Sequence, residues 1–254
     1  MRVWVWGIAL LGVGVGMTAY FFPVTQECFL CPPTKEAWLG TDPLGRDIAV
    51  RLLRAWSLTT GIALGAAMLS TGLGTIVGLV AGSQRGILDS LLLIGVQTLW
   101  VVPALLWAAL LAFVGGKNWL TLITAIGLST WVETARLIRI ETQKLWRFAF
   151  VEAGRALGLP HKRLLRRHVL PNLWPIVRTQ FLQVFATATL IEAGLSFVGL
   201  GPTGENVSLG TLLFESIQWL TLPQGLVQGL LAGTLLSGTV FAVYSLTGYG
   251  RDSF

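Results

Sequence analysis

Long stretches without a charged side chain constrain this chain more than any other feature of its sequence. A helix needs about 20 mostly apolar residues to cross the hydrocarbon core of a membrane, and such stretches recur along the whole chain. Because they are continuously apolar rather than alternating, they indicate helices and not the strands of a membrane barrel. They predict an all-α integral membrane protein with six spans, at residues 3–22, 58–81, 91–114, 118–136, 173–197 and 224–247.

The composition of the spans and loops supports a membrane protein. Charged residues make up 12% of the 254 residues, whereas a soluble domain carries about 25%, which argues against an ordinary soluble enzyme, a disordered chain or a disulfide scaffold. The net charge of +6 is explained by basic cytoplasmic loops, so we expect contact with membrane lipid and no nucleic-acid partner. Glycines inside the spans, including Gly61, Gly72, Gly74 and Gly78, would let helices pack closely.

The distribution of Lys and Arg predicts the orientation. If the N-terminus is cytoplasmic, 13 of the 18 Lys and Arg residues fall on inner segments, as the positive-inside rule requires. Both termini are therefore expected in the cytoplasm. The first span could be a cleaved signal peptide, but its apolar region is too long and no Ala-x-Ala site follows, so we interpret it as an anchor.

The spans leave three longer loops in a single domain, residues 1–254. They are an outer loop at 23–54, an inner loop at 133–172 and an outer loop at 199–223. In the first outer loop, Asp42 and Pro43 have the pattern of a helix N-cap and first turn. The interfacial helix that follows would have an apolar face and three basic side chains facing elsewhere, Arg46, Arg51 and Arg54. It could be a membrane-surface strut or a contact for a binding protein.

The inner loop has the pattern of two helices joined by a tight turn. Residues 141–157 are rich in helix formers, Gly158 can end a helix in the left-handed conformation, and Pro160 suits the first turn of the next helix. That second helix, at 162–170, would be closed by Pro171. It carries a basic stripe of Lys162, Arg163, Arg166 and Arg167. The pair could lie on anionic lipid headgroups or dock onto another protein, and the pattern leaves both open.

A few polar side chains are candidates for function. Glu192, toward the outer side of the fifth span, could line a pathway or gate or pack against a neighbouring helix, and Gln183 and Ser196 of the same span are further pathway candidates. Cys28 and Cys31 form an isolated Cys-x-x-Cys in the first outer loop. A local disulfide is the leading interpretation there, ahead of free thiols and metal capture.

Three motifs of this chain resemble binding-protein-dependent ABC importer permeases. Glu152-Ala153-Gly154, then Gly158, then Leu170-Pro171 are similar to the Glu-Ala-Ala loop of that family. Gly154 replaces its second Ala and is expected to loosen the first helix slightly. The residues around the Leu-Pro pair, His168 to Asn172, resemble the dipeptide, oligopeptide and nickel subfamily.

The other two motifs resemble the same subfamily. One follows the first span and consists of Gly40, Thr41, Asp42, Gly45, Arg46 and Asp47. The other, residues 192–201, ends the fifth span. The short first outer loop is similar to that of the C-type subunit of the permease pair, and residues 205–222 would be a surface or re-entrant helix in the external gate.

The resemblance implies a six-span type I importer permease in the bacterial inner (plasma) membrane. It would form half of the pathway for peptides or for nickel or other metal chelates. Its partners would be a second homologous permease subunit, a substrate-binding protein and two ATPase subunits that bind ATP and Mg. This chain has no Gly-x-x-x-x-Gly-Lys-[Ser/Thr] loop, so we expect neither enzyme activity nor a bound cofactor. The implied ATPase-docking residues are Glu152, Ala153, Gly154, Ala156, Leu157, Gly158, Leu170 and Pro171.

Two rival functions share parts of this pattern. An ion-coupled secondary transporter or channel subunit would have the same spans but would not need the inner docking loop. A membrane-embedded hydrolase would need a nucleophile and a base within the membrane, yet both histidines, His161 and His168, fall in the inner loop.

Overall fold

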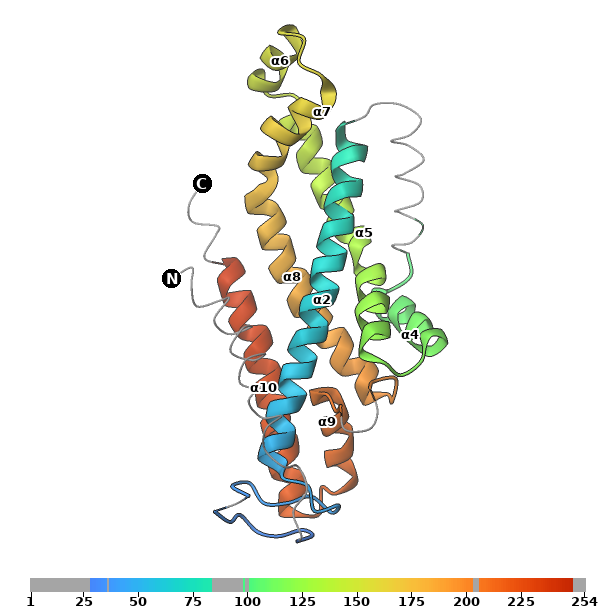
Figure 1. Ribbon diagram of the computed structural model, residues 1–254, viewed down its shortest axis with the longest axis vertical. Coiled ribbons are helices and arrows are strands. Elements are labelled where there is room, and N and C mark those ends of the chain that lie inside the picture. The colour runs from blue at the N-terminus through green and yellow to red at the C-terminus, as the bar shows by residue number, and fades with distance from the viewer. Residues whose placement is uncertain (1–27, 36, 84–97, 99–100, 203–205, 249–254) are drawn as a thin grey trace.

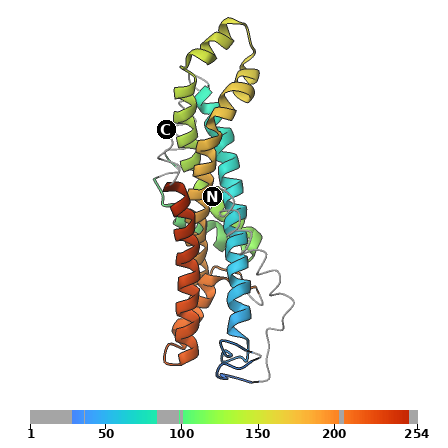
Figure 2. The ribbon, with the colours of Figure 1, turned by 90° about the vertical axis from the view of Figure 1, so that its left-hand side faces the viewer.

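The computed structural model describes residues 28–35, 37–83, 98, 101–202 and 206–248, and the regular elements of this part are helices (Figure 1). They form one elongated bundle in which α2, α5 and α8 run side by side (Figures 1 and 2). The helices are α2 (Ile48–Ser83), α4 (Ala104–Gly115), α5 (Trp119–Leu145), α6 (Ala149–Ala156), α7 (His161–Leu164), the π-helical turn η1 (Leu165–Val169), α8 (Leu170–Phe197), α9 (Leu209–Gln218) and α10 (Pro223–Gly248).

The two ends of the bundle carry different elements. α6 and α7 project beyond one end, here named the upper end after its place in Figure 1, while α9 and the start of α2 lie toward the lower end. Buried apolar side chains form a central, a lower and an upper cluster along the bundle. The upper cluster consists of Ile138, Trp146, Val151, Leu164, Val169, Leu173 and Val177.

Small residues bring α2 and α5 into close contact. Gly74, Gly78 and Gly82 lie about one turn apart on α2. A Cβ atom at these positions would come within 2.5, 2.5 and 2.6 Å of α5 atoms. Backbone approach of this kind holds helices together in a membrane, where apolar burial gives little driving force. The predicted close packing is therefore confirmed at Gly74 and Gly78, whereas Gly61 and Gly72 face open space.

α2 begins earlier than the predicted second span and absorbs the predicted interfacial helix. It is continuous from Ile48, so the outer loop expected at 23–54 ends before that residue. Asp42 and Pro43 form a turn instead of capping a helix. The capping carboxylate belongs to Asp47, whose Oδ1 accepts two N–H groups of the first turn at 2.7 and 3.2 Å. The prediction of a separate surface helix is therefore wrong.

The inner loop predicted at 133–172 is mostly helical. α5 extends to Leu145, and the helix predicted over 141–157 is interrupted before α6 begins. Pro171 does not close a helix, because α7, η1 and α8 follow one another without a gap. Pro171 lies in the first turn of α8, a position at which proline is well tolerated.

Two described helices, α2 and α10, are long and apolar enough to cross a membrane by length and composition. α10 coincides with the predicted sixth span, α8 contains the predicted fifth, and α5 covers the predicted fourth from Trp119 onward. α4 is apolar but shorter, and the predicted third span, 91–114, is described continuously only from residue 101. The predicted first span, 3–22, lies outside the described residues. The total of six spans therefore stays a prediction.

Candidate functional site

The upper segment, defined as residues 149–164, folds as two short helices around a left-handed turn. Gly158 has a φ of +73° directly after α6. Its N–H donates to the carbonyl of Arg155 at 2.9 Å, and the N–H of Leu159 donates to the carbonyl of Gly154 at 3.1 Å. These two hydrogen bonds form the Schellman arrangement that ends helices, so the turn predicted at Gly158 is confirmed.

Gly154 lies at a close contact between α6 and α7. It is buried, and a Cβ atom there would lie 2.6 Å from Cδ2 of Leu164. The glycine that departs from the Glu-Ala-Ala pattern therefore serves packing inside the segment. The close contact with Leu164 holds the two helices against each other, and the expectation that the glycine loosens α6 stays a prediction.

The outward face of the upper segment displays most of the predicted docking residues. Those exposed are Glu152, Ala153, Ala156, Leu157 and Gly158. The Leu157 side chain is 81% exposed, although leucine is among the residues most often buried. At the start of α6, seven or more residues before Leu157, the exposed rings of Phe148 and Phe150 stack with their centroids 6.0 Å apart. Large exposed apolar side chains on one short segment are typical of a protein-interaction surface.

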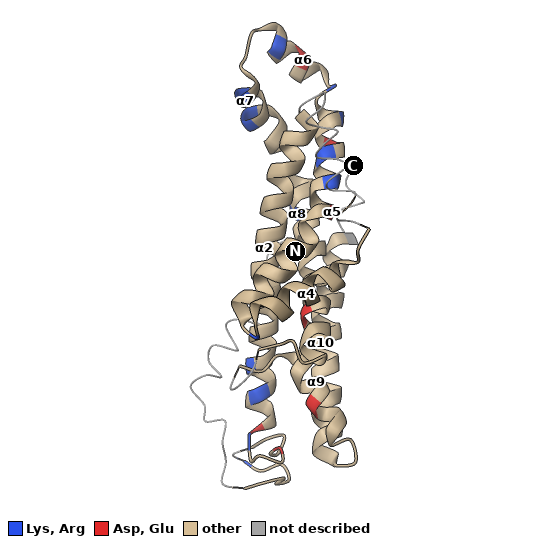
Figure 3. Ribbon diagram, turned by 90° about the vertical axis from the view of Figure 1, so that its right-hand side faces the viewer, with Lys and Arg blue, Asp and Glu red and all other residues tan. Residues whose placement is uncertain are grey.

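Two of the predicted docking residues lie elsewhere. Leu170 and Pro171 begin α8 and are not part of the upper segment. The basic side chains predicted as a stripe gather around α7 and η1, and Figure 3 shows further basic residues at the upper end of α5. Lys162, Arg163, Arg166 and Arg167 are all exposed, so lipid headgroups and a protein partner can both reach them.

Asp42 is the centre of the outer motif at the lower end. Its Oδ1 accepts the backbone N–H groups of Leu44 and Arg46, both at 2.8 Å. Its Oδ2 accepts Nε of Arg46 at 2.6 Å and Nη1 of Arg51 at 2.9 Å. The carboxylate is buried and fully partnered, so it stabilises the turn and has no capacity left for a ligand.

Arg51 connects this turn to α9. Its Nη2 lies 2.8 Å from Oε2 of Glu215, and only 2% of its side chain is exposed. The prediction that Arg51 faces away from the apolar side is wrong, because the motif turn and α9 enclose the start of α2. Sequence reasoning missed Glu215 as a partner. The available signal was that Glu215 is the sole acidic residue between 206 and 248, and an acid in an apolar stretch needs a cationic partner.

The other residues of the outer motif shape the backbone around Asp42. Gly40 and Gly45 have φ values of +79° and +73°. A Cβ atom at Gly40 would lie 2.5 Å from the carbonyl oxygen of Cys31. Thr41 and Asp47 form an isolated antiparallel β-bridge. The motif therefore builds one compact turn immediately before α2.

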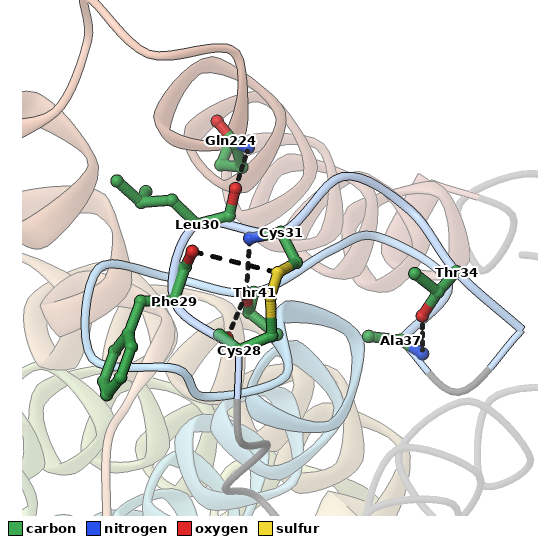
Figure 4. The surroundings of a disulfide bond; sticks show 8 residues. All are labelled: Cys28, Phe29, Leu30, Cys31, Thr34, Ala37, Thr41 and Gln224. Atoms are coloured by element: carbon green, nitrogen blue, oxygen red, sulfur yellow. Dashed lines mark hydrogen bonds between the residues drawn. A yellow bond between two sulfur atoms is a disulfide. The ribbon is translucent and has the colours of Figure 1, made fainter.

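A disulfide joins Cys28 and Cys31, whose Cα atoms are 5.8 Å apart, and braces the loop beside this turn (Figure 4). Thr41 Oγ1 accepts the N–H of Cys31 at 2.8 Å and donates to the carbonyl of Cys28 at 2.9 Å. Gln224 of α10 donates to the carbonyl of Leu30 at 3.2 Å. The loop is therefore fastened to the outer motif on one side and to α10 on the other.

Glu192 is completely buried where α8, α2 and α9 meet. Its Oε1 accepts the hydroxyl of Ser196 at 2.7 Å, while its Oε2 is buried with no hydrogen-bond partner among the described residues. Thr59 on α2 and Ser208 before α9 lie close to this carboxylate. Thr59 Oγ1 also accepts the N–H of Leu209, the first residue of α9, at 3.1 Å. Within this chain, the surroundings of Glu192 favour the packing alternative over an open pathway.

Gln183 is not brought to this group. Its side chain is exposed, and at 3.6 residues per turn it lies about half a turn away from Glu192 around α8. Ser196 therefore joins Glu192, while Gln183 occupies a different face of the same helix. A role of Gln183 in the pathway stays a prediction.

Comparison with known proteins places these features in a family. Residues 74–249 match the family described as binding-protein-dependent transport system inner membrane component. The chain belongs to this family. Membership confirms the predicted integral membrane protein and its predicted class, a transport component and not an enzyme.

Curated relatives agree with the predicted subfamily. The oligopeptide transport system permease protein OppC of Bacillus subtilis is 35% identical over 190 residues, covering 75% of this chain and 62% of that protein. OppC of Haemophilus influenzae is 30% identical over 215 residues, covering 82% and 69%. The dipeptide transport system permease protein DppC of B. subtilis is 31% identical over 186 residues, covering 73% and 58%. The match thus spans less than two thirds of either B. subtilis relative.

Proposed function

We propose that this chain is the C-type permease subunit of an ATP-driven oligopeptide or dipeptide importer. It forms half of the translocation pathway beside a second homologous permease subunit. Two ATPase subunits bind ATP and Mg, and a substrate-binding protein delivers the peptide. The observation that carries this proposal is the exposed apolar face of the upper segment in a chain of the binding-protein-dependent transport family.

Peptides are the proposed substrate class because the relatives above are named as oligopeptide and dipeptide permease proteins. Nickel or other metal chelates are the alternative class that the sequence motifs allow. Among the described residues, no group of three or more His, Cys, Asp or Glu side chains could hold a metal ion. A chelate would therefore be carried through without a resident metal site in this part of the chain.

The proposed topology has six spans and both termini in the cytoplasm of a bacterial cell. It places the upper segment inside and the disulfide loop outside. The exposed basic side chains at the upper end support this orientation (Figure 3), since Lys and Arg accumulate on the cytoplasmic side. The disulfide supports it as well, because such bonds persist in oxidising compartments.

The upper segment is proposed to seat in a cleft of one ATPase subunit. Its Schellman turn and the Gly154–Leu164 contact make it a preformed shape, so little conformational entropy is lost when it binds. The exposed Leu157 side chain would supply a buried anchor of the kind that dominates interface energies.

The test is co-expression of a tagged chain with a candidate second permease and two ATPases. The tag should recover all four subunits. The reconstituted complex should hydrolyse ATP faster, and import peptide, when peptide-loaded binding protein is added. Recovery of the chain without ATPases, with uptake driven by an ion gradient, would instead establish the secondary transporter or channel alternative.

A further inference from the structure

Trp146 occupies the junction between the upper segment and the long helices. It follows the last residue of α5, and only 6% of it is exposed. The guanidinium carbon of Arg155 on α6 lies 4.7 Å from the centroid of its ring. The imidazole of His161 on α7 lies 4.8 Å from it, centroid to centroid. One indole at the end of α5 therefore contacts both helices of the upper segment.

His161 extends this junction to α2. Its Nε2 lies 3.2 Å from Oγ of Ser83, the last residue of α2, and that hydroxyl donates to the carbonyl of Val80 at 2.9 Å. A serine hydroxyl has a single hydrogen to donate, so Ser83 Oγ accepts in the contact with His161. An imidazole that carries a hydrogen on Nε2 can therefore donate to Ser83 Oγ and connect α7 to α2.

The upper segment meets this junction as one body. The Gly154–Leu164 contact and the turn at Gly158 lock α6 to α7. Its remaining contribution to the bundle core is apolar, through Val151 and Leu164 in the upper cluster. Apolar contacts have no preferred direction. The ring contacts and hydrogen bonds around Trp146 are directional, so they determine how the segment is oriented on the bundle.

The ends of α2 and α5, which contact the upper segment, are also packed rigidly against each other. Gly82, next to Ser83, approaches α5 so closely that a Cβ atom there would lie 2.6 Å from the carbonyl oxygen of Arg139. The ends of α2 and α5 are thus locked together directly beside the junction. A displacement of the upper segment that is transmitted through Trp146 and His161 therefore moves both helices at once.

We propose that Arg155, Trp146 and His161 form a joint that positions the upper segment on α2 and α5, and that transport requires this joint independently of ATPase binding. The proposal rests on the proposed function, because the joint transmits movements that the ATPases impose. None of its three side chains belongs to the predicted docking residues. They are positioning residues that act between the docking face and the spans.

The test uses three substitutions in the complete four-subunit complex with its binding protein. Trp146→Ala removes the ring, Arg155→Met removes the cation but keeps a long side chain, and His161→Leu removes the hydrogen bond to Ser83. We expect unchanged recovery of ATPases and unchanged basal ATP hydrolysis. Stimulation of hydrolysis by peptide-loaded binding protein and peptide uptake should each fall by about fivefold or more, the lower range of typical coupling between sites.

Two further variants separate positioning from general damage. Trp146→Phe keeps an aromatic face for the cation and should retain most of the uptake. Trp174→Ala makes the same chemical change on α8 at a side chain that is 65% exposed and is not part of the upper cluster, and it should behave as the unmodified chain.

The outcomes that overturn the joint are distinct from those that overturn the function. Normal uptake in all three joint variants overturns it, as does a loss of uptake that only parallels a loss of bound ATPase. If Trp146→Ala fails to accumulate in the membrane, Arg155→Met and His161→Leu decide by the same criteria, since both change exposed side chains. Failure of the unmodified chain to recover any ATPase would refute the proposed function itself.

Discussion

Among single residues, the ion pair of Arg51 and Glu215 contributes strongly to the stability of the lower end of the bundle. Removing one partner of a buried pair costs about 3–5 kcal/mol. Because Glu215 is partly exposed, we expect Glu215→Leu to lower the free energy of unfolding by about 2 kcal/mol, within the range set by buried and surface pairs. Thermal unfolding of the purified chain in detergent would show this as a lower Tm.

The same pair offers its own control. In the double variant Arg51→Leu with Glu215→Leu, the buried carboxylate of Asp42 loses Arg51 but keeps Arg46, so each remaining charge is still paired and part of the lost stability should return. The pair of Glu141 and Lys144, 2.6 Å apart, gives the surface reference, because its lysine is 62% exposed whereas Arg51 is 2% exposed. Glu141→Gln should change the unfolding free energy by less than about 1 kcal/mol. Equal effects of Glu141→Gln and Glu215→Leu would contradict the assignment of Glu215 as a structural partner.

Gly158 tests the docking face with a single side chain. Its φ of +73° disfavours any side chain, and no atom lies within 4 Å of a Cβ built there. Gly158→Asp therefore adds moderate backbone strain and a charge at the proposed interface. Burying an unpaired charge costs several kcal/mol, and affinity falls tenfold for about every 1.4 kcal/mol. We expect normal membrane abundance but lost ATPase recovery and lost uptake.

Gly116 provides the matched control for that substitution. It has a φ of +85°, and a Cβ atom there would also meet open space, but it follows α4 instead of α6. Gly116→Asp adds the same charge, and because its ψ of 170° lies in a region open almost only to glycine it imposes at least as much strain, yet it should not affect ATPase recovery. If both variants lose the ATPases, the effect of Gly158→Asp is not specific to docking.

At the scale of helices, the glycines of α2 determine how it packs on α5. Gly78→Leu would place a side chain where a Cβ atom already lies 2.5 Å from the carbonyl oxygen of Ala135. Overpacking costs about 1–3 kcal/mol, so we expect reduced membrane abundance and a lower Tm. A Cβ atom at the exposed Gly72 would meet no atom within 4 Å, so Gly72→Leu should be close to neutral in the same assays. A fall in Tm for Gly72→Leu as large as for Gly78→Leu would show that the glycine stripe does not select the packing.

The helices themselves could largely be predicted from their apolar stretches, but where they begin and end could not. An Asp followed by Pro suits an N-cap and equally a turn. The side chain of Asp42 satisfies N–H groups within its own turn, leaving Asp47 to cap α2. Likewise, Pro171 can follow the end of a helix or open a new one. Here the helix continues through Pro171, because Val169 and Leu173 on either side of it are buried in the upper cluster. That cluster also contains residues far away in sequence, which a local pattern does not reveal.

The features of the candidate site could be predicted from the sequence where they depend only on neighbouring residues. Gly158 ends α6 as its sequence context predicts, because the turn depends on backbone conformation alone. The roles of Gly154, Glu215 and Trp146 depend on which side chain lies opposite: Leu164, Arg51 and His161 respectively. No spacing within the sequence reveals those partners, so these roles appear only in the folded chain.

At the scale of the whole molecule, the orientation of the bundle connects its two ends to the proposed function. The upper segment must lie in the cytoplasm to meet an ATPase, and the disulfide loop must then lie outside. Single cysteines at Lys162, Asn118 and Thr221, all exposed, can report this with a membrane-impermeant maleimide in a background that lacks Cys28 and Cys31. Thr221 lies between α9 and α10, and Asn118 precedes α5.

We expect labelling at Asn118 and Thr221 in intact spheroplasts and at Lys162 only after permeabilisation. The reverse pattern would place the upper segment outside and remove the importer mechanism, while labelling of Asn118 and Thr221 from opposite sides would contradict the proposed arrangement of spans.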